Sequence, residues 1–123
     1  MSSYPRIFRV RQHFTGPTVA DVAAETRLQL GKLPLKDRIK PGASVAVTAG
    51  SRGIANIAKI IRATVEHLKS IGAKPFIVPA MGSHGGGTAE GQVEILHGYG
   101  ITEEFCGCPI RARAPRGGMC CRR

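Results

Sequence analysis

A chain of 123 residues with 42% hydrophobic and 5% aromatic residues fits one domain whose core is built mainly from aliphatic side chains, the composition of a sheet covered by helices. The net charge of +10 is uneven: residues 1–110 hold 13 Lys and Arg against 8 Asp and Glu, and the last thirteen residues add five arginines and no acid. Half of the excess charge therefore lies in a short tail. The sequence starts without the apolar region of a secretory leader and has no run of the ~18 apolar residues that a membrane span needs, which favours a cytoplasmic protein without a membrane partner.

The first forty residues carry weaker structural signals. Apolar residues alternate loosely with Arg and Gln over residues 7–14, which predicts an edge strand with one face in water. A helix is predicted over residues 18–30, with Thr18 as its N-cap and Asp21 in the acidic position of a capping box. A turn at residues 40–42, Lys-Pro-Gly, leads into the centre of the chain.

The centre of the chain has the clearest pattern. Residues 44–48 are a short apolar strand, followed after a glycine-rich loop by an amphipathic helix of about five turns that Gly72 ends. Residues 75–78 are a second apolar strand, and Thr88 caps another helix through about His97. The long helix is predicted because its apolar residues recur at helical spacing: Ile54, Ile57, Ala58, Ile61, Val65 and Leu68.

A strand, a helix and a second strand at this spacing predict a right-handed βαβ unit with parallel strands. The expected fold class is α/β, a three-layer Rossmann-like segment with an incomplete sheet. If the strands are neighbours, both glycine-rich loops leave the same carboxyl edge, where open α/β sheets bind ligands. We assign residues 1–110 to this α/β domain and residues 111–123 to a basic, disordered tail, which departs from the pattern as abruptly as a shifted reading frame would.

The first loop, residues 49–53, predicts an anion site. Gly50 and Gly53 let the backbone approach a ligand closely, and the helix that follows points free N–H groups at the same place. Arg52 adds a planar fork that grips a carboxylate through two hydrogen bonds, and its neighbour Ser51 is included in the predicted substrate-binding set. The alternative is that Arg52 is an ordinary solvated loop residue and the glycines only turn the chain.

The second loop, residues 79–87, carries a histidine among glycines. An imidazole gives or takes a proton near neutral pH, so His84 suits acid/base work on a hydroxyl group. Its neighbours Ser83 and Gly85 complete the predicted substrate-binding set. A histidine in such a loop can also be incidental, and spacing alone leaves both roles open.

Three other interpretations are weaker. Residues 48–55 resemble the cofactor loop of short-chain dehydrogenases, but Ala49 and Ala55 stand where that loop has glycines, so dinucleotide binding is a minor alternative. The terminal arginines have no aromatic residues among them, which predicts weak attraction to polyanions without specific nucleic-acid binding. A C-x-C pair followed by adjacent cysteines is not the usual spacing of a zinc site, so no metal site is predicted from Cys106, Cys108, Cys120 and Cys121.

Residues 45–54, Val-Ala-Val-Thr-Ala-Gly-Ser-Arg-Gly-Ile, and residues 75–86, Pro-Phe-Ile-Val-Pro-Ala-Met-Gly-Ser-His-Gly-Gly, resemble the N-terminal domain of the nickel-dependent lactate racemase family. The likeness runs over about residues 10–111, is closest to a branch without a generally defined substrate, and is most specific in the Gly-Ser-His-Gly-Gly loop. The resemblance implies that His84 takes the proton of a 2-hydroxyl group while Arg52 holds the substrate carboxylate.

The resemblance also implies a cofactor and a partner domain. Full chains of the family close a two-domain cleft over a nickel pincer nucleotide, which accepts hydride from C2 of the substrate. The residues that attach this cofactor belong to family segments beyond residue 123, so we expect a missing C-terminal domain and no activity of this chain alone. Ala49, Ser51 and Gly53 stand where lactate racemases have Asp, Thr and Pro, so the implied ligand is a small 2-hydroxy carboxylate rather than lactate in particular. The alternative from another class is a small anion- or nucleotide-binding α/β module without catalysis.

Overall fold

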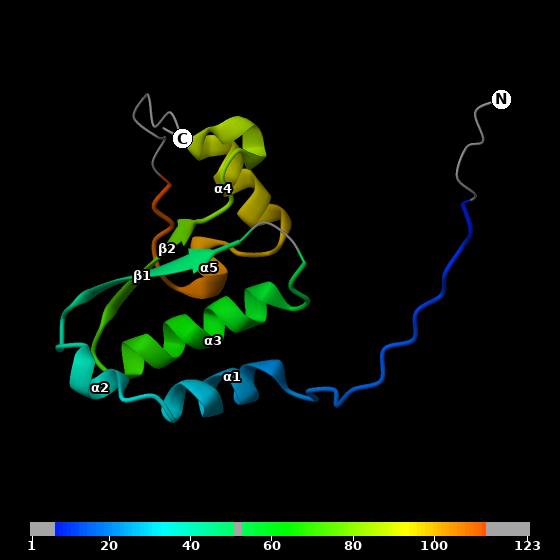
Figure 1. Cartoon of the computed structure of the whole chain (residues 1–123). Coiled ribbons are helices and arrows are strands. Elements are labelled where there is room, and N and C mark those ends of the chain that lie inside the picture. Colours follow the sequence, from blue (N-terminus) through cyan, green and yellow to red (C-terminus); the bar gives the residue numbers. More distant parts are fainter. Residues whose placement is uncertain (1–6, 51–52, 113–123) are drawn as a thin grey trace, which may run out of the picture.

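A computed structural model describes residues 7–50 and 53–112 and shows a small α/β fold, in which helices pack on a two-stranded parallel sheet (Figure 1). Both predicted strands and the helix between them are confirmed. The elements in chain order are α1 (Val22–Gly31), α2 (Leu35–Arg38), β1 (Ser44–Ala49), α3 (Ile57–Ser70), β2 (Lys74–Pro79), the 3₁₀ helix η1 (His84–Gly87), α4 (Ala89–Gly98) and α5 (Glu103–Cys106).

The two strands run parallel in a register that pairs Ser44 with Lys74 and Ala49 with Pro79. Side chains alternate between the two faces of the sheet, and only one face is deeply buried. On the other face, Ala46 and Thr48 are exposed. The core lies between the buried face and α3 and includes Val47, Ala49, Ile77, Ile61, Val65 and Leu68.

A third segment runs beside β2, on the edge away from β1. Ile77 donates its N–H to the carbonyl of Pro109 at 2.8 Å and accepts a bond from the Arg111 N–H at 2.8 Å. Pro75 and Pro79 occupy the two β2 positions on either side of Ile77 that face the same edge. Because proline has no N–H, β2 can donate to this segment only through Ile77. The sequence analysis did not predict this pairing.

Helix α3 is the amphipathic helix that the apolar spacing predicts, but it begins three residues later. Asn56 takes the left-handed conformation, with φ 59°, and Ile54 is half-exposed in the loop before it. The helix ends as expected before Gly72, which has φ +85°. The first glycine-rich loop is therefore longer than predicted.

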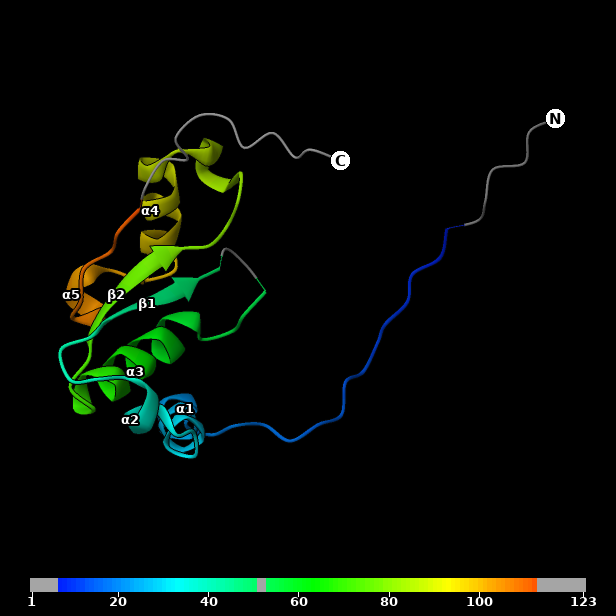
Figure 2. The same cartoon turned by 60° about the vertical axis from the view of Figure 1, so that its left-hand side comes forward.

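Helix α1 packs against the outer side of α3, so α3 lies between α1 and the sheet (Figure 2). Its N-cap is Asp21, whose carboxylate accepts the N–H of Ala24 at 2.9 Å, and the prediction of Thr18 as the cap is wrong. The prediction of an edge strand over residues 7–14 is also wrong. These residues are exposed and extend away from the folded body without regular structure, because no neighbouring strand is there to accept their backbone hydrogen bonds (Figures 1 and 2).

Candidate functional site

Both glycine-rich loops begin side by side at the carboxyl edge of the sheet. Ala49 and Pro79, the last residues of the two strands, are paired in the register, and the Ala80 N–H donates to the Ala49 carbonyl at 2.8 Å. Gly50 after β1, and Ala80 and Met81 after β2, lead into the two loops. The expectation that the loops share one sheet edge is confirmed.

The first loop is described only in part. Gly50 is partly buried and Gly53 is exposed with φ +83°, a conformation that glycine adopts without strain. Ser51 and Arg52 lie outside the described residues, so the predicted carboxylate fork stays a prediction. Asn56 enters α3 without a hydrogen bond from its side chain to the first turn.

The second loop has a buried residue near its start, and the residues after it reach the surface. Met81 is 6% exposed and belongs to the core cluster, and its carbonyl accepts the His84 N–H at 3.2 Å. Ser83 is exposed, whereas the His84 side chain is partly buried, with its Nδ1 atom removed from solvent.

The glycines of this loop allow its backbone to lie directly on the first turn of α4. Gly85 has φ +64°, and a Cβ atom there would come within 2.5 Å of the Gly91 carbonyl oxygen and 2.7 Å of the Gln92 nitrogen. Gly86 and Gly87 also have positive φ, but a Cβ on either would meet open space. A side chain at position 85 would therefore clash with α4 and also strain the backbone. At positions 86 and 87 it would only strain the backbone, because of the positive φ.

Side chains of α4 hold the loop in place. The Thr88 hydroxyl donates to the Gly85 carbonyl at 3.0 Å and accepts the Gly91 N–H at 3.1 Å, so it caps the helix as predicted and fixes the loop at the same time. Gln92 donates from Nε2 to the Gly82 carbonyl at 2.7 Å. Hydrogen bonds to α4 therefore flank His84 on both sides. The sequence analysis missed the role of Gln92, although its position one turn after a predicted cap places it near the loop.

The cysteines that the structure describes are buried thiols. Burial raises the pKa of the Cys106 thiol to about 11, with the neighbouring Cys108 contributing, and burial also raises the pKa of Cys108. Both groups are therefore poor nucleophiles at neutral pH. Cys120 and Cys121 lie outside the described residues. Among the described residues, no group of three or more His, Cys, Asp or Glu side chains is arranged to hold a metal ion.

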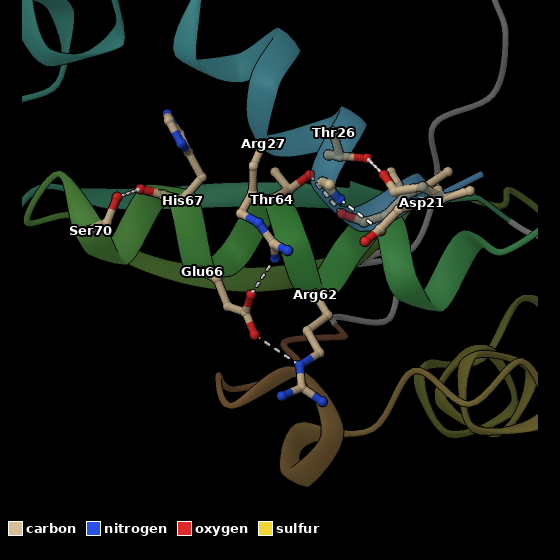
Figure 3. A network of polar contacts seen from close by, with 11 residues as sticks. Asp21, Thr26, Arg27, Arg62, Thr64, Glu66, His67 and Ser70 are labelled. Atoms are coloured by element: carbon tan, nitrogen blue, oxygen red, sulfur yellow. Dashed lines mark hydrogen bonds and ion pairs between the residues drawn. The ribbon is translucent and has the colours of Figure 1, made fainter. Parts of the chain in front are cut away.

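A charged network centred on Glu66 of α3 joins this helix to α1 and α5 (Figure 3). Glu66 binds Arg27 of α1 at 3.0 Å and Arg62 of its own helix at 2.9 Å, and the Arg62 guanidinium lies 5.0 Å from the centre of the Phe105 ring of α5. The hydrogen bond from Arg62 holds the pKa of Glu66 below its ordinary value. This network joins three helices and has no arrangement typical of catalysis.

The comparisons with known proteins give no relative: no family model, no curated protein and no solved structure matches the chain. Across the described residues, no helix combines the length and the apolar character needed to cross a membrane.

Proposed function

We propose that the carboxyl edge of the β1–β2 sheet binds a small 2-hydroxy carboxylate, and that the chain is the N-terminal part of a lactate racemase-like isomerase. The observation that supports this most directly is the common origin of the two loops, with Ala80 hydrogen-bonded to Ala49 at 2.8 Å. The proposal includes a larger Rossmann-like, three-layer sheet with a right-handed crossover, of which β1, α3 and β2 are one unit.

Each loop has a separate task in this proposal. Arg52 binds the carboxylate through two parallel hydrogen bonds, with Ser51 and the backbone of Gly50 and Gly53 beside it. His84 accepts the proton of the 2-hydroxyl group at Nε2 and returns it later, while the Ser83 hydroxyl and the Gly85 backbone line the same side. The burial of Nδ1 supports this assignment because it leaves Nε2 as the ring nitrogen that can face a ligand.

No group of three or more His, Cys, Asp or Glu side chains in the described part of the chain is arranged to hold a metal ion. We assign attachment of the nickel pincer nucleotide to the C-terminal domain that the resemblance implies. The proposal for this chain is limited to carboxylate binding and proton transfer.

A second candidate is an anion-binding module that uses only backbone N–H groups. The positive φ values of Gly82, Gly85, Gly86 and Gly87 favour it, because such backbone can present N–H groups to a ligand without interference from side chains. The two candidates differ in their need for His84: a module without chemistry tolerates its replacement, whereas an acid/base site does not.

An NMR titration of the ¹⁵N-labelled chain separates the two candidates. Glycolate, which has a 2-hydroxyl group, and propionate, which lacks it, are compared with inorganic phosphate. We expect glycolate to shift the amide signals of residues 82–87 and to bind roughly fivefold more tightly than propionate, the value of one net hydrogen bond. His84→Gln should remove this preference but keep carboxylate binding, and Arg52→Gln should abolish carboxylate binding.

The control is His97→Gln, on an exposed position of α4, which should change neither result. Phosphate binding that is unaffected by His84→Gln, without any preference for glycolate, would favour the anion-binding module. Absence of shifts in the loop signals with glycolate, propionate and phosphate alike would refute both.

A further inference from the structure

The segment before α1 is apolar, extended and exposed. Ile7 is 97% exposed, Phe8 79%, Val10 76% and Phe14 85%. Phe8, Val10 and Phe14 lie at even spacing, so in an extended chain they fall on one side, with Arg9 and Arg11 on the other. We call residues 7–14 the arm. Large apolar side chains gathered on one side of an exposed segment mark an interaction site.

A groove between α1 and α3 offers a matching surface. Its volume is about 400 Å³, and its wall includes Val22 and Leu30 of α1 and Ile60 of α3. Two threonines also line it, and both turn their hydroxyls away to their own helices: Thr26 donates to the Val22 carbonyl at 2.7 Å and Thr64 donates to the Ile60 carbonyl at 2.9 Å (Figure 3). The threonines therefore need no polar partner from an occupant, and the groove can accept an apolar one.

The charges beside the groove suit the arm. Glu25 lines the groove, and it also lines the adjoining hollow together with Asp21. These are two of only 8 acidic residues in a chain of net charge +10. Arg9 and Arg11 lie between the apolar residues of the arm along the chain, so with the apolar side in the groove their long side chains would reach these carboxylates only by bending round the edge of the arm.

We propose that the arm of one copy of this chain docks in the α1–α3 groove of a second copy, and that the exchange is reciprocal. The structure holds the arm away from its own body although Val19, at the rim of the groove, is only five residues from Phe14 (Figures 1 and 2). An arm that extends outward is placed to reach another molecule. If two copies are related by a two-fold axis, the arm of each fills the groove of the other.

The arms would supply a large part of the area that a specific interface needs. The four phenylalanine rings of two arms, at roughly 200 Å² each, would bury about 800 Å². Specific protein interfaces bury about 1,200–2,000 Å². This surface is independent of the sheet edge and of the function proposed for it.

Sedimentation velocity over a range of concentrations tests the proposal. The native chain should dimerise below ~100 µM, and the double variant Phe8→Ser/Phe14→Ser should weaken self-association by at least roughly 100-fold, because two buried rings are lost from each of the two arms. Ile60→Lys, which places a charge in the groove, should weaken it similarly. Circular dichroism of each variant checks that it is folded, and the arm variant is safe in this respect because both rings are exposed.

The matched control is Leu33→Ser, which removes an apolar side chain that is 53% exposed and lies outside the arm and the groove. It should leave the dimer unchanged. A native chain that remains monomeric at ~100 µM overturns the proposal. The same holds if limited proteolysis of that monomer shows the arm protected, because the arm would then occupy the groove of its own molecule. A dimer that survives the arm variant, or one that survives Ile60→Lys in a folded chain, also overturns it.

Discussion

The close approach of the His84 loop to α4 predicts that Gly91→Ala destabilises the protein. Gly91 lies inside α4, where alanine normally stabilises a helix relative to glycine by about 1 kcal/mol. Here a Cβ atom would lie 2.8 Å from the Gly85 carbonyl carbon and 2.9 Å from the Thr88 Oγ1 atom, and closer still to the Gly85 carbonyl oxygen. The backbone of the loop would have to move by about 1 Å, and overpacking of this kind costs about 1–3 kcal/mol.

The net effect of Gly91→Ala is therefore a loss of up to about 2 kcal/mol, or a fall in Tm of up to roughly 10 °C for a domain of this size. Gly98→Ala, in the last turn of the same helix, is the matched control, because a Cβ there meets nothing within 4 Å. It should be neutral or stabilising. Thermal unfolding followed by circular dichroism measures both. If Gly91→Ala proves as stable as Gly98→Ala, the contact between Gly85 and Gly91 does not exist in solution.

Three further predictions concern other parts of the chain. Because burial raises the pKa of Cys106 to about 11, its thiolate is scarce at pH 8, and iodoacetamide should modify it far more slowly in the folded chain than in urea, as mass spectrometry can show; equal rates would contradict its burial. The lowered pKa of Glu66 stabilises the fold above the ordinary value of 4.5, and this contribution disappears as the pH falls through the lower folded value. Glu66→Gln should therefore cost less than about 1 kcal/mol at pH 6 and nothing near pH 2, since the pair with Arg62 is half-exposed; equal losses at both pH values in thermal unfolding would argue against the ion pair. Finally, the chain alone should not racemise 2-hydroxy acids, because inversion needs proton acceptors on both faces of C2 and only His84 is offered; chiral chromatography that shows turnover dependent on His84 would refute this.

The strands and α3 could be predicted because their signals are local. An apolar run precedes each glycine-rich loop, and apolar residues recur at helical spacing from Ile57 to Leu68. Packing the helix on the two strands buries these residues in one core. The start of α3 could not be predicted from that spacing. Ile54 continues the apolar spacing, but Asn56 takes a left-handed conformation, so the helix starts only at Ile57 and Ile54 stays exposed in the loop before it.

The two errors near the N-terminus have one physical origin. Alternation over residues 7–14 predicts a strand only if another strand accepts its hydrogen bonds, and the sequence does not contain that information. The choice between Thr18 and Asp21 as the cap of α1 is of the same kind, since both residue types cap helices well. Asp21 is selected by where the helix packs on α3, and Arg27 of α1 reaches Glu66 of α3 at 3.0 Å.

The sequence shows the residues of the candidate site but not the contacts that hold them in place. His84 among glycines is visible in the sequence, as is the cap at Thr88. The bonds from Gln92 to Gly82 and from Thr88 to Gly85 depend on how the loop folds back over α4, which no local pattern encodes.

Hydrogen bonds to α4 hold the second loop in place. Movement of His84 toward a ligand would break the bond from Gln92 to Gly82 or force Gly85 against Gly91, so the second loop is held in advance of binding. The first loop carries the residues that differ from the lactate racemase pattern, Ala49, Ser51 and Gly53. If the proposed function holds, adaptation to a particular carboxylate would belong to the first loop, and substitutions there should change which acid binds while leaving the position of the imidazole unchanged.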